Sequence, residues 1–122
     1  MIQVAQHIGA EIFVTVSSTE KRDLMKECGI KDDHIFNSRD LSFTKGIKRM
    51  TNGQGVDVII NTLTAEALRQ TWACISPFGR FVELGKKDVL ANNKLEMKHF
   101  SANASFSLVN IQVIFLYDQF FR

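Results

Sequence analysis

Short apolar runs that alternate with amphipathic segments limit the possible folds of this chain more than any other feature. β-Branched and aromatic residues cluster in four runs, each typical of a strand: residues 12–16, 34–36, 56–60 and 81–84. Between them, apolar side chains recur at helical spacings of three and four in residues 20–28, 42–50 and 64–75. Strands and helices that alternate about every twenty residues predict βαβ units and a parallel sheet with helices on both faces. One α/β domain with a doubly wound parallel sheet is therefore expected.

Several local signals refine this outline. The run 12–16 contains no polar alternation, which predicts a strand buried on both faces, and Thr19 is expected to cap the helix that follows. Pro77 is expected to end the helix of residues 64–75, because proline cannot continue a helix. Beyond Asp88 the pattern weakens, with a short helix expected at 95–100 and a strand at 106–109.

Composition excludes several classes of protein. The chain has 122 residues, the length of one modest domain. Its 15 basic residues are interleaved with 13 acidic ones, without the basic stripe of a nucleic-acid-binding protein. Two cysteines and three histidines are scattered without ligand spacing, so no metal site is expected, and a cytoplasmic, reducing location is favoured. The apolar tail after residue 104 lacks the run of about 20 apolar residues that a membrane span needs, so no membrane association is expected.

Polar residues follow the first strand, at the edge where open α/β sheets bind ligands. In dinucleotide-binding folds, an acidic residue at the end of the second strand holds the ribose 2′-hydroxyl of NAD. If the run 12–16 corresponds to that second strand, Ser17 takes the place of the acidic residue. Ser17 is followed by Ser18, Lys21 and Arg22, and together these residues can accept a 2′-phosphate. The residues therefore favour NADP(H). The alternative is that the serines only cap a helix while Lys21 and Arg22 are solvated.

Small or polar residues also follow the later strands. Asn61 and Leu63 come after the run 56–60, and Gly85 and Lys86 come after the run 81–84. Their place at strand ends predicts an approach to the nicotinamide end of a dinucleotide, although each is also a common turn residue.

A glycine-rich phosphate loop and the strand before it are missing from the expected pattern. Such a loop links the first strand to the first helix of a dinucleotide-binding fold, and this chain is expected to open inside that helix. The first strand lies between the second and the fourth, so its absence should leave two apolar strand edges unpaired. A marginal fold with weak cofactor binding is expected.

Four segments in the same order resemble a known family: residues 5–22, 33–43, 53–63 and 73–88. They are similar to medium-chain dehydrogenases/reductases of the quinone-oxidoreductase-like superfamily, and especially to the enoyl reductase domains of reducing polyketide synthases and fatty acid synthase. The resemblance implies an incomplete Rossmann-like domain that binds NADP(H) over residues 1–110, followed by a divergent apolar tail at 111–122.

The resemblance also implies an activity. Enoyl reductases of this kind use NADPH to reduce an α,β-unsaturated thioester held on an acyl carrier domain, with hydride going to the β-carbon and a proton to the α-carbon. No metal is required. The family's 2′-phosphate region matches Ser17, Ser18, Lys21 and Arg22, and its nicotinamide-side loops match Asn61, Leu63, Gly85 and Lys86.

Catalysis by the chain alone is not expected. Asp88 matches a carboxylate proposed to assist proton delivery in some relatives, but the lysine that partners it there falls near Ala67, which cannot donate a proton. The family's substrate domain has no counterpart here. We therefore expect a cofactor-binding fragment of an enoyl reductase that acts with the remainder of a synthase. A non-catalytic interaction module, with residues 106–121 as a partner-binding edge, is the alternative, and homodimers or aggregates could form through unpaired strand edges.

Overall fold

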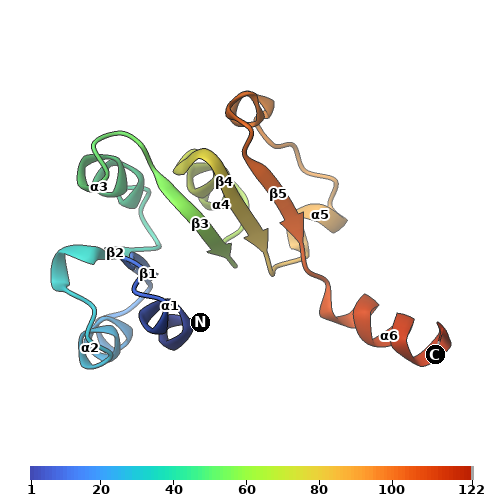
Figure 1. Ribbon diagram of the computed structural model, residues 1–122, viewed down its shortest axis with the longest axis horizontal. Helices are drawn as coiled ribbons and strands as arrows, with labels where there is room; N and C mark the ends of the chain where they lie inside the picture. The colour runs from blue at the N-terminus through green and yellow to red at the C-terminus, as the bar shows by residue number, and fades with distance from the viewer. Residues whose placement is uncertain (122) are drawn as a thin grey trace.

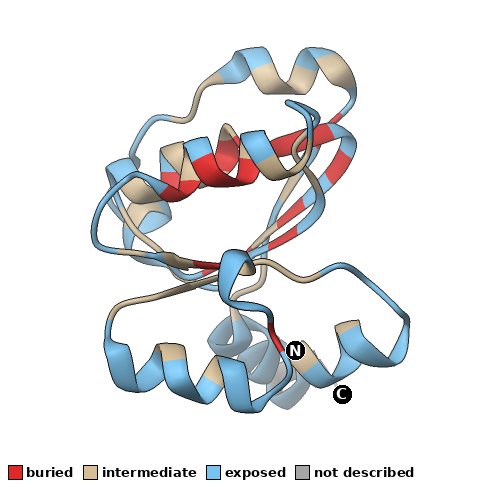
Figure 2. Cartoon of the chain, turned by 90° about the vertical axis from the view of Figure 1, so that its left-hand side faces the viewer, coloured by how far each residue is buried: buried red, intermediate tan, exposed pale blue. Residues whose placement is uncertain are grey.

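The computed structural model describes residues 1–121, and the side chains of residues 1–119, as short strands flanked by helices (Figure 1). The elements in chain order are α1 (Ile2–His7), β1 (Val14–Val16), α2 (Thr19–Glu27), the 3₁₀ turn η1 (Asp32–His34), β2 (Ile35–Asn37), α3 (Phe43–Met50), β3 (Val56–Asn61), α4 (Glu66–Trp72), β4 (Ile75–Glu83), α5 (Lys87–Leu90), η2 (Met97–Ala102), β5 (Ser105–Leu108) and α6 (Ile111–Phe121). Helices lie on both sides of the strands, and buried residues gather between the layers (Figure 2). None of the described helices is long and apolar enough to cross a membrane.

All strand pairs among the described residues are parallel, as the alternation predicted. β1 pairs with β2, from Val14 opposite Ile35 to Val16 opposite Asn37. A second sheet has the order β3-β4-β5. Within the part of the chain that the structure describes, β1 has no partner on its side away from β2, and β3 has none on its side away from β4. The edges of β1 and β3 are therefore unpaired among the described residues, as are those of β2 and β5 on the far side of each sheet.

The unpaired edges change the burial of both strands. Residues Val14–Val16 are only half-buried, so the prediction of a strand buried on both faces was wrong. In β3, Val58 is 50% exposed and Ile60 is 38% exposed. Apolar strand residues need a neighbouring strand and a covering layer on each face to be buried, and the described residues supply these only in part.

An aromatic cluster joins α4 to the second sheet. The Trp72 side chain is fully buried and meets the rings of Phe81 and Phe106 edge-on, at centroid distances of 5.6 and 5.8 Å. Phe81 and Phe106 stack on each other at 4.7 Å. The indole N–H of Trp72 donates to the carbonyl oxygen of Glu96 at 2.8 Å, so its one polar atom is satisfied.

The helix predicted at 64–75 is shorter than expected. α4 ends at Trp72, and Ile75 already begins β4, where its side chain packs in the core from a strand. β4 continues through Pro77 because the residue before a proline prefers extended backbone. The register against β3 shifts between Val56 and Val58, and Phe78 adopts a positive φ of 60° in the bulge that results.

α3 packs against residues of both sheets. Its Phe43 and Ile47 are buried in the same cluster as Ile59 of β3, and Phe36 of β2 packs against that cluster. A Cβ atom at Gly46 would lie 2.1 Å from a ring carbon of Phe36, so only glycine lets this helix approach β2 so closely. Contacts made by α3 therefore connect the first half of the domain to the second.

His34 ties the approach to β2 to the approach to β1. Its Nδ1 lies 2.6 Å from a carboxylate oxygen of Asp33, and its Nε2 lies 2.9 Å from a carboxylate oxygen of Glu11. The imidazole stacks on the ring of Phe13 at a centroid distance of 4.6 Å. The hydrogen bond with Asp33, and to a smaller extent the one with Glu11, raise the pKa of His34 above its ordinary value.

This raised pKa predicts a pH dependence of stability. Because the folded pKa of His34 exceeds the unfolded value of about 6.5, protonation stabilises the fold fully below about pH 6.5, and that contribution is lost as the pH rises through the folded pKa. In urea denaturation, the free energy of unfolding should decrease as the pH rises through this range. The decrease should be smaller in His34→Gln, whereas His7→Gln on the exposed α1 should show the same decrease as the parent chain. An identical pH profile for His34→Gln and the parent chain would contradict this assignment.

Candidate functional site

The N-terminus of α2 stands directly after β1 and is capped by Ser18. Ser18 has extended backbone, and its hydroxyl oxygen accepts a hydrogen bond from the backbone N–H of Lys21 at 3.3 Å. The prediction that Thr19 caps this helix was wrong by one residue, since Thr19 is already helical. Serine and threonine are both good caps, so the sequence alone does not separate them.

Ser17 and Lys21 come together at this helix end. The Lys21 ammonium donates to the Ser17 hydroxyl at 3.1 Å, and the lysine is exposed while the serine is half-buried. The pair offers one cation and a hydroxyl beside the first turn of a helix, where backbone N–H groups and the helix dipole favour a negative charge. This arrangement can accept an anion, and the phosphate-accepting role of these residues stays a prediction.

Arg22, by contrast, is committed to the fold. Its guanidinium donates to the Asp32 carboxylate at 3.0 and 3.1 Å, to the Asp32 carbonyl at 3.0 Å and to the Ile35 carbonyl at 2.9 Å. These contacts connect α2 to the turn before β2. The hydrogen bonds from Lys26 and Arg22 lower the pKa of Asp32, which keeps this carboxyl ionised. The structure therefore places Arg22 beside the predicted phosphate site but directs its side chain elsewhere.

Arg39 is a cation at this edge that the sequence reasoning left out. Ser38 follows β2, and its N–H donates to the Val16 carbonyl at 2.8 Å, which joins the ends of β1 and β2. The backbone N–H of Arg39 donates to the Asn37 side chain at 2.8 Å, and its exposed guanidinium forms no ion pair among the described residues. Its place shortly after the strand predicted at 34–36 was the sequence signal that could have identified it, because parallel strands end at the same edge of a sheet.

On the second sheet, the Asn61 side chain shapes the loop that follows β3. Its amide donates to the Leu63 carbonyl at 2.9 Å, and its oxygen accepts from the Leu63 N–H at 3.2 Å. Asn61 is only 2% exposed. Its side chain is thus buried and occupied within the chain, whereas Leu63 is half-buried at the same edge.

Glu83 is a buried carboxylate next to Asn61. One carboxylate oxygen accepts from the Asn61 amide at 2.6 Å, and the other accepts from the Gly85 N–H at 2.6 Å. Burial raises the pKa of Glu83, and the two hydrogen bonds act in the opposite direction. The sequence reasoning missed this residue by treating it as part of an apolar strand, although a single acidic residue inside that run is itself a signal.

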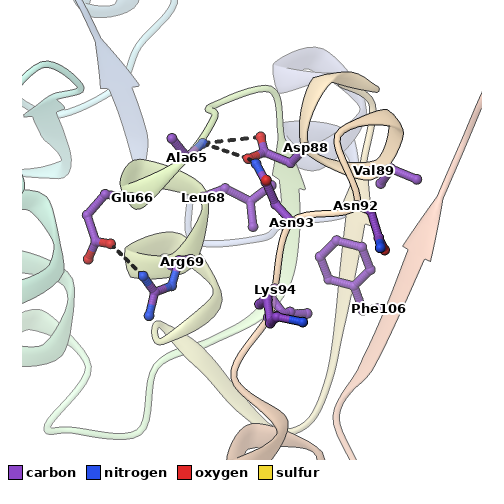
Figure 3. Close-up of a pocket in the computed structure, with 11 residues that line it drawn as sticks. Ala65, Glu66, Leu68, Arg69, Asp88, Val89, Asn92, Asn93, Lys94 and Phe106 are labelled. Carbon is purple, nitrogen blue, oxygen red and sulfur yellow. Dashed lines mark hydrogen bonds and ion pairs between the residues drawn. The ribbon is translucent and has the colours of Figure 1, made fainter.

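Asp88 lines a cavity of about 620 Å³ between α4, the segment after β4 and β5 (Figure 3). Both of its carboxylate oxygens accept from the Ala65 N–H at 3.1 Å, and one also accepts from the Asn93 side chain at 2.8 Å. Ala65 has a φ of 54° and a ψ of −128°, a strained backbone for a residue with a Cβ atom. Asp88 therefore holds the start of α4 in a conformation that the chain would otherwise disfavour.

The remaining predicted residues lie at the same edge. Gly85 is half-buried directly after β4, and Lys86 is exposed beside it, where its ammonium donates to the Gln112 side chain of α6. The structure thus brings Asn61, Leu63 and Gly85 together through Glu83. No group of three histidine, cysteine or acidic side chains that could hold a metal ion occurs in the described part of the chain.

Comparison with known proteins gives a consistent picture. The family model described as zinc-binding dehydrogenase matches residues 1–119. The chain is 60% identical over 111 residues to the highly reducing polyketide synthase dmxL2 of Cryptosporiopsis sp., and 57% identical over 122 residues to the reducing polyketide synthase FUB1 of Gibberella fujikuroi. These matches cover 90% and 98% of this chain, which spans only 5% of the length of either relative.

Solved structures show the same likeness. The nucleotide-binding subdomain of the enoylreductase domain of PpsC from Mycobacterium tuberculosis is 36% identical with a TM-score of 0.86, over 96% of this chain and 65% of that one. The CurK enoyl reductase is 37% identical with a TM-score of 0.76, over 97% of this chain and 33% of that one. The fold described above therefore matches the Rossmann-like fold of the nucleotide-binding subdomain of an enoyl reductase.

The contacts of Arg22 predict that its replacement affects folding. Lysine cannot form the forked contact with Asp32 and reach the Ile35 carbonyl at once, and loss of that part-buried carbonyl bond alone costs about 1 kcal/mol. Arg22→Lys should lower the urea midpoint of unfolding without changing the slope. Arg49→Lys, at an exposed site of α3, is the control and should leave the midpoint in place. An unchanged midpoint in Arg22→Lys would show that these contacts do not support the fold.

Proposed function

Because the chain belongs to the zinc-binding dehydrogenase family, we propose that it is the NADP(H)-binding part of an enoyl reductase that serves a reducing polyketide synthase. The proposal is supported by the identity of 57–60% with reducing polyketide synthases and by the likeness to a nucleotide-binding subdomain of an enoyl reductase. The reaction would be reduction of an α,β-unsaturated thioester carried on an acyl carrier domain. NADPH would supply the hydride.

The contact between Lys21 and Ser17 is the observation that carries the choice of NADPH over NADH. A carboxylate at the end of β1 would accept a hydrogen bond from the ribose 2′-hydroxyl of NADH and would repel a 2′-phosphate. This place holds a serine. The Lys21 ammonium, 3.1 Å from the Ser17 hydroxyl, supplies the charge that a phosphate needs. Ser18 contributes by capping α2, and Arg22 by fixing the orientation of that helix against β2.

At the other end of the cofactor, the loops after β3 and β4 would meet the nicotinamide. Leu63 and Gly85 present backbone and apolar surface there, and Lys86 lies at the rim. Asn61 is buried and would act by shaping the loop of Leu63. A preformed surface of this kind would orient a nicotinamide ring so that hydride leaves from one face.

Asp88, near the loops proposed to meet the nicotinamide, is the residue that the family resemblance offers for proton delivery. Its oxygens already accept hydrogen bonds from Ala65 and Asn93, so its contacts favour holding the start of α4 over delivering a proton. Ala67 has no side-chain group that can donate. We therefore expect the proton donor, the acyl substrate site and the acyl carrier domain to come from other parts of a cytoplasmic synthase, and the chain to be inactive alone.

Thermal shift with NADPH and NADH tests the cofactor proposal. NADPH should raise the melting temperature of the chain in a concentration-dependent manner, and NADH should do so much less. Lys21→Ala should weaken NADPH binding about ten- to hundredfold, because a hydrogen bond to a charged group contributes about 1.5–3 kcal/mol, and should leave NADH binding unchanged. Lys31→Ala, which removes an exposed lysine from the turn before β2, is the matched control.

Two results would count against the cofactor proposal. Equal stabilisation by NADPH and NADH would remove the role of Lys21 in recognising the 2′-phosphate. Absence of stabilisation by either nucleotide would show that the strand-end residues do not bind a dinucleotide in this chain.

The exposed surface of α6 favours a second candidate, a non-catalytic interaction module that forms homodimers. Ile111, Phe115 and Leu116 are 57%, 69% and 53% exposed, and α6 extends away from the sheet (Figure 1). Apolar surface of this extent commonly marks a protein–protein contact. The unpaired edges of β1 and β3 add a second surface at which strands of another copy could pair.

Sedimentation velocity over a range of concentrations tests the dimer. If α6 forms the contact, the chain should sediment as a dimer at micromolar concentration, and Phe115→Glu should shift it to a monomer. Phe78→Glu, at a phenylalanine that is 74% exposed in the bulge of β4, is the control and should remain dimeric. A monomeric parent chain at all concentrations would exclude this candidate.

A further inference from the structure

We propose that Glu83 is a positioning residue that fixes the two nicotinamide-side loops of the site relative to each other. The inference rests on the proposed function for the identity of the ligand, but its geometry is independent of any ligand. Glu83 is 1% exposed and would touch neither cofactor nor substrate. It would act entirely through Asn61 and Gly85.

Glu83 and Asn61 are register partners at the carboxyl ends of neighbouring strands. Asn61 of β3 pairs with Glu83 of β4, so their side chains lie side by side on the buried face. The carboxylate accepts one hydrogen bond from the Asn61 amide and one from the Gly85 N–H, each at 2.6 Å. One side chain is thereby bonded both to the strand before one loop and to the first residue of the other.

Both hydrogen bonds extend into the loops themselves. The Asn61 amide group that contacts Glu83 also holds the Leu63 backbone through two hydrogen bonds, so the carboxylate, Asn61 and Leu63 form a continuous chain. On the other side, a Cβ atom at Gly85 would lie 2.9 Å from a Glu83 oxygen. A side chain at this position would displace the carboxylate, so glycine permits the close approach.

Stability of the sheet alone does not account for a carboxylate here. A buried carboxylate is costly without a cation, and no ion pair of Glu83 occurs among the described residues. The inward residues that precede these two on the same strands, Ile59 and Phe81, are apolar and buried. An apolar residue would extend that core at lower cost, but it could not accept from both the Asn61 amide and the Gly85 N–H.

The same two strands provide a matched control at their opposite end. The Asp57 carboxylate of β3 accepts from the Ser76 hydroxyl of β4 at 2.8 Å, near the amino ends of the strands. This contact connects the strands but reaches neither loop. Asp57→Asn and Glu83→Gln therefore each alter one acidic side chain of the β3–β4 pair, and only the second should disturb the loops.

Amide hydrogen exchange of the full chain tests the positioning role without nucleotide. Whichever way the side-chain amide introduced by Glu83→Gln is turned, its NH₂ group faces one of the two donors, so one hydrogen bond must be lost. Glu83→Gln should speed exchange at Leu63 or Gly85 about tenfold or more, while β1 and β2 keep their protection. Asp57→Asn should leave both loop amides as in the parent chain.

Nucleotide binding gives a second readout that separates the inference from the proposed function. The probe 2′,5′-ADP carries only the adenosine end of NADPH and would contact the region of Ser17 and Lys21. Glu83→Gln should weaken NADPH binding about tenfold, because a hydrogen bond that holds one of the loops is lost, and should leave 2′,5′-ADP binding unchanged. Asp57→Asn should leave the binding of both ligands unchanged. If the parent chain binds neither ligand, the proposed function fails, and hydrogen exchange still decides whether Glu83 positions the loops.

Two results would overturn the inference. The first is that Glu83→Gln leaves the exchange rates of the Leu63 and Gly85 amides unchanged, or speeds them only as much as those of all other strand amides. The second is an equal loss of NADPH and 2′,5′-ADP binding. If Glu83→Gln does not fold, Glu83→Asp keeps the carboxylate but shortens its reach by one methylene group, and the same comparison with Asp57→Asn applies.

Discussion

The packing of Trp72 between α4 and the second sheet is the interaction on which the candidate site depends most. Trp72 is fully buried against Phe81 and Phe106, and truncation of such a side chain typically costs about 3–5 kcal/mol. Natural domains are stable by only about 5–15 kcal/mol, so this contact represents a large share. It also fixes α4, and with it the strained turn at Ala65 and the loop that leaves β3. The aromatic core therefore sets where the nicotinamide-side loops can lie.

The two ends of the proposed site lie on two different sheets. The residues proposed to accept the phosphate belong to the sheet of β1 and β2, and the loops proposed to meet the nicotinamide belong to the sheet of β3, β4 and β5. Among the described residues no strand pairing joins these sheets, and α3 bridges them through Phe43, Ile47 and the close contact of Gly46 with Phe36. The distance between the two ends of the proposed site would thus depend on side-chain packing and not on a backbone hydrogen-bond ladder.

Periodicity identified most of the architecture from the sequence, and it failed where tertiary context decides. Apolar runs predicted the positions of all five described strands in outline, and the helical spacings predicted α2 and α3. The helix at 64–75 was drawn too long because Ile75 fits a helical stripe as well as it fits the start of β4. A proline two residues after Ile75 fits a helix end or an extended strand equally well, and only the pairing of Ile75 with Val56 distinguishes the two.

For the site, strand-end logic selected residues that the structure places at the strand ends, but it did not predict how each side chain is used. The proximity of Ser17 and Lys21 follows from their spacing across one helical turn, so the sequence contained it. The hydrogen bonds of Arg22 to Asp32 and Ile35, and those of Asp88 to Ala65, join segments ten or more residues apart, and no local pattern encodes them. Glu83 was overlooked although an acidic residue inside an apolar run is a signal, because its contact with Asn61 becomes visible only when β3 and β4 are placed in register.

These contacts separate the polar residues at the strand ends into those that shape the site and those that remain accessible to a ligand. Arg22, Asn61 and Asp88 are each satisfied by other parts of the chain, so they shape the site without being free to bind a ligand. Ser17 and Lys21 remain at the accessible edge of the first sheet, where charge can select a phosphate. Cofactor selectivity would then depend on the adenosine end, and the geometry of hydride transfer on buried hydrogen bonds at the nicotinamide end. A substitution at the adenosine end should change affinity for one nucleotide over another, and one at the nicotinamide end should change how rigidly any nucleotide is held.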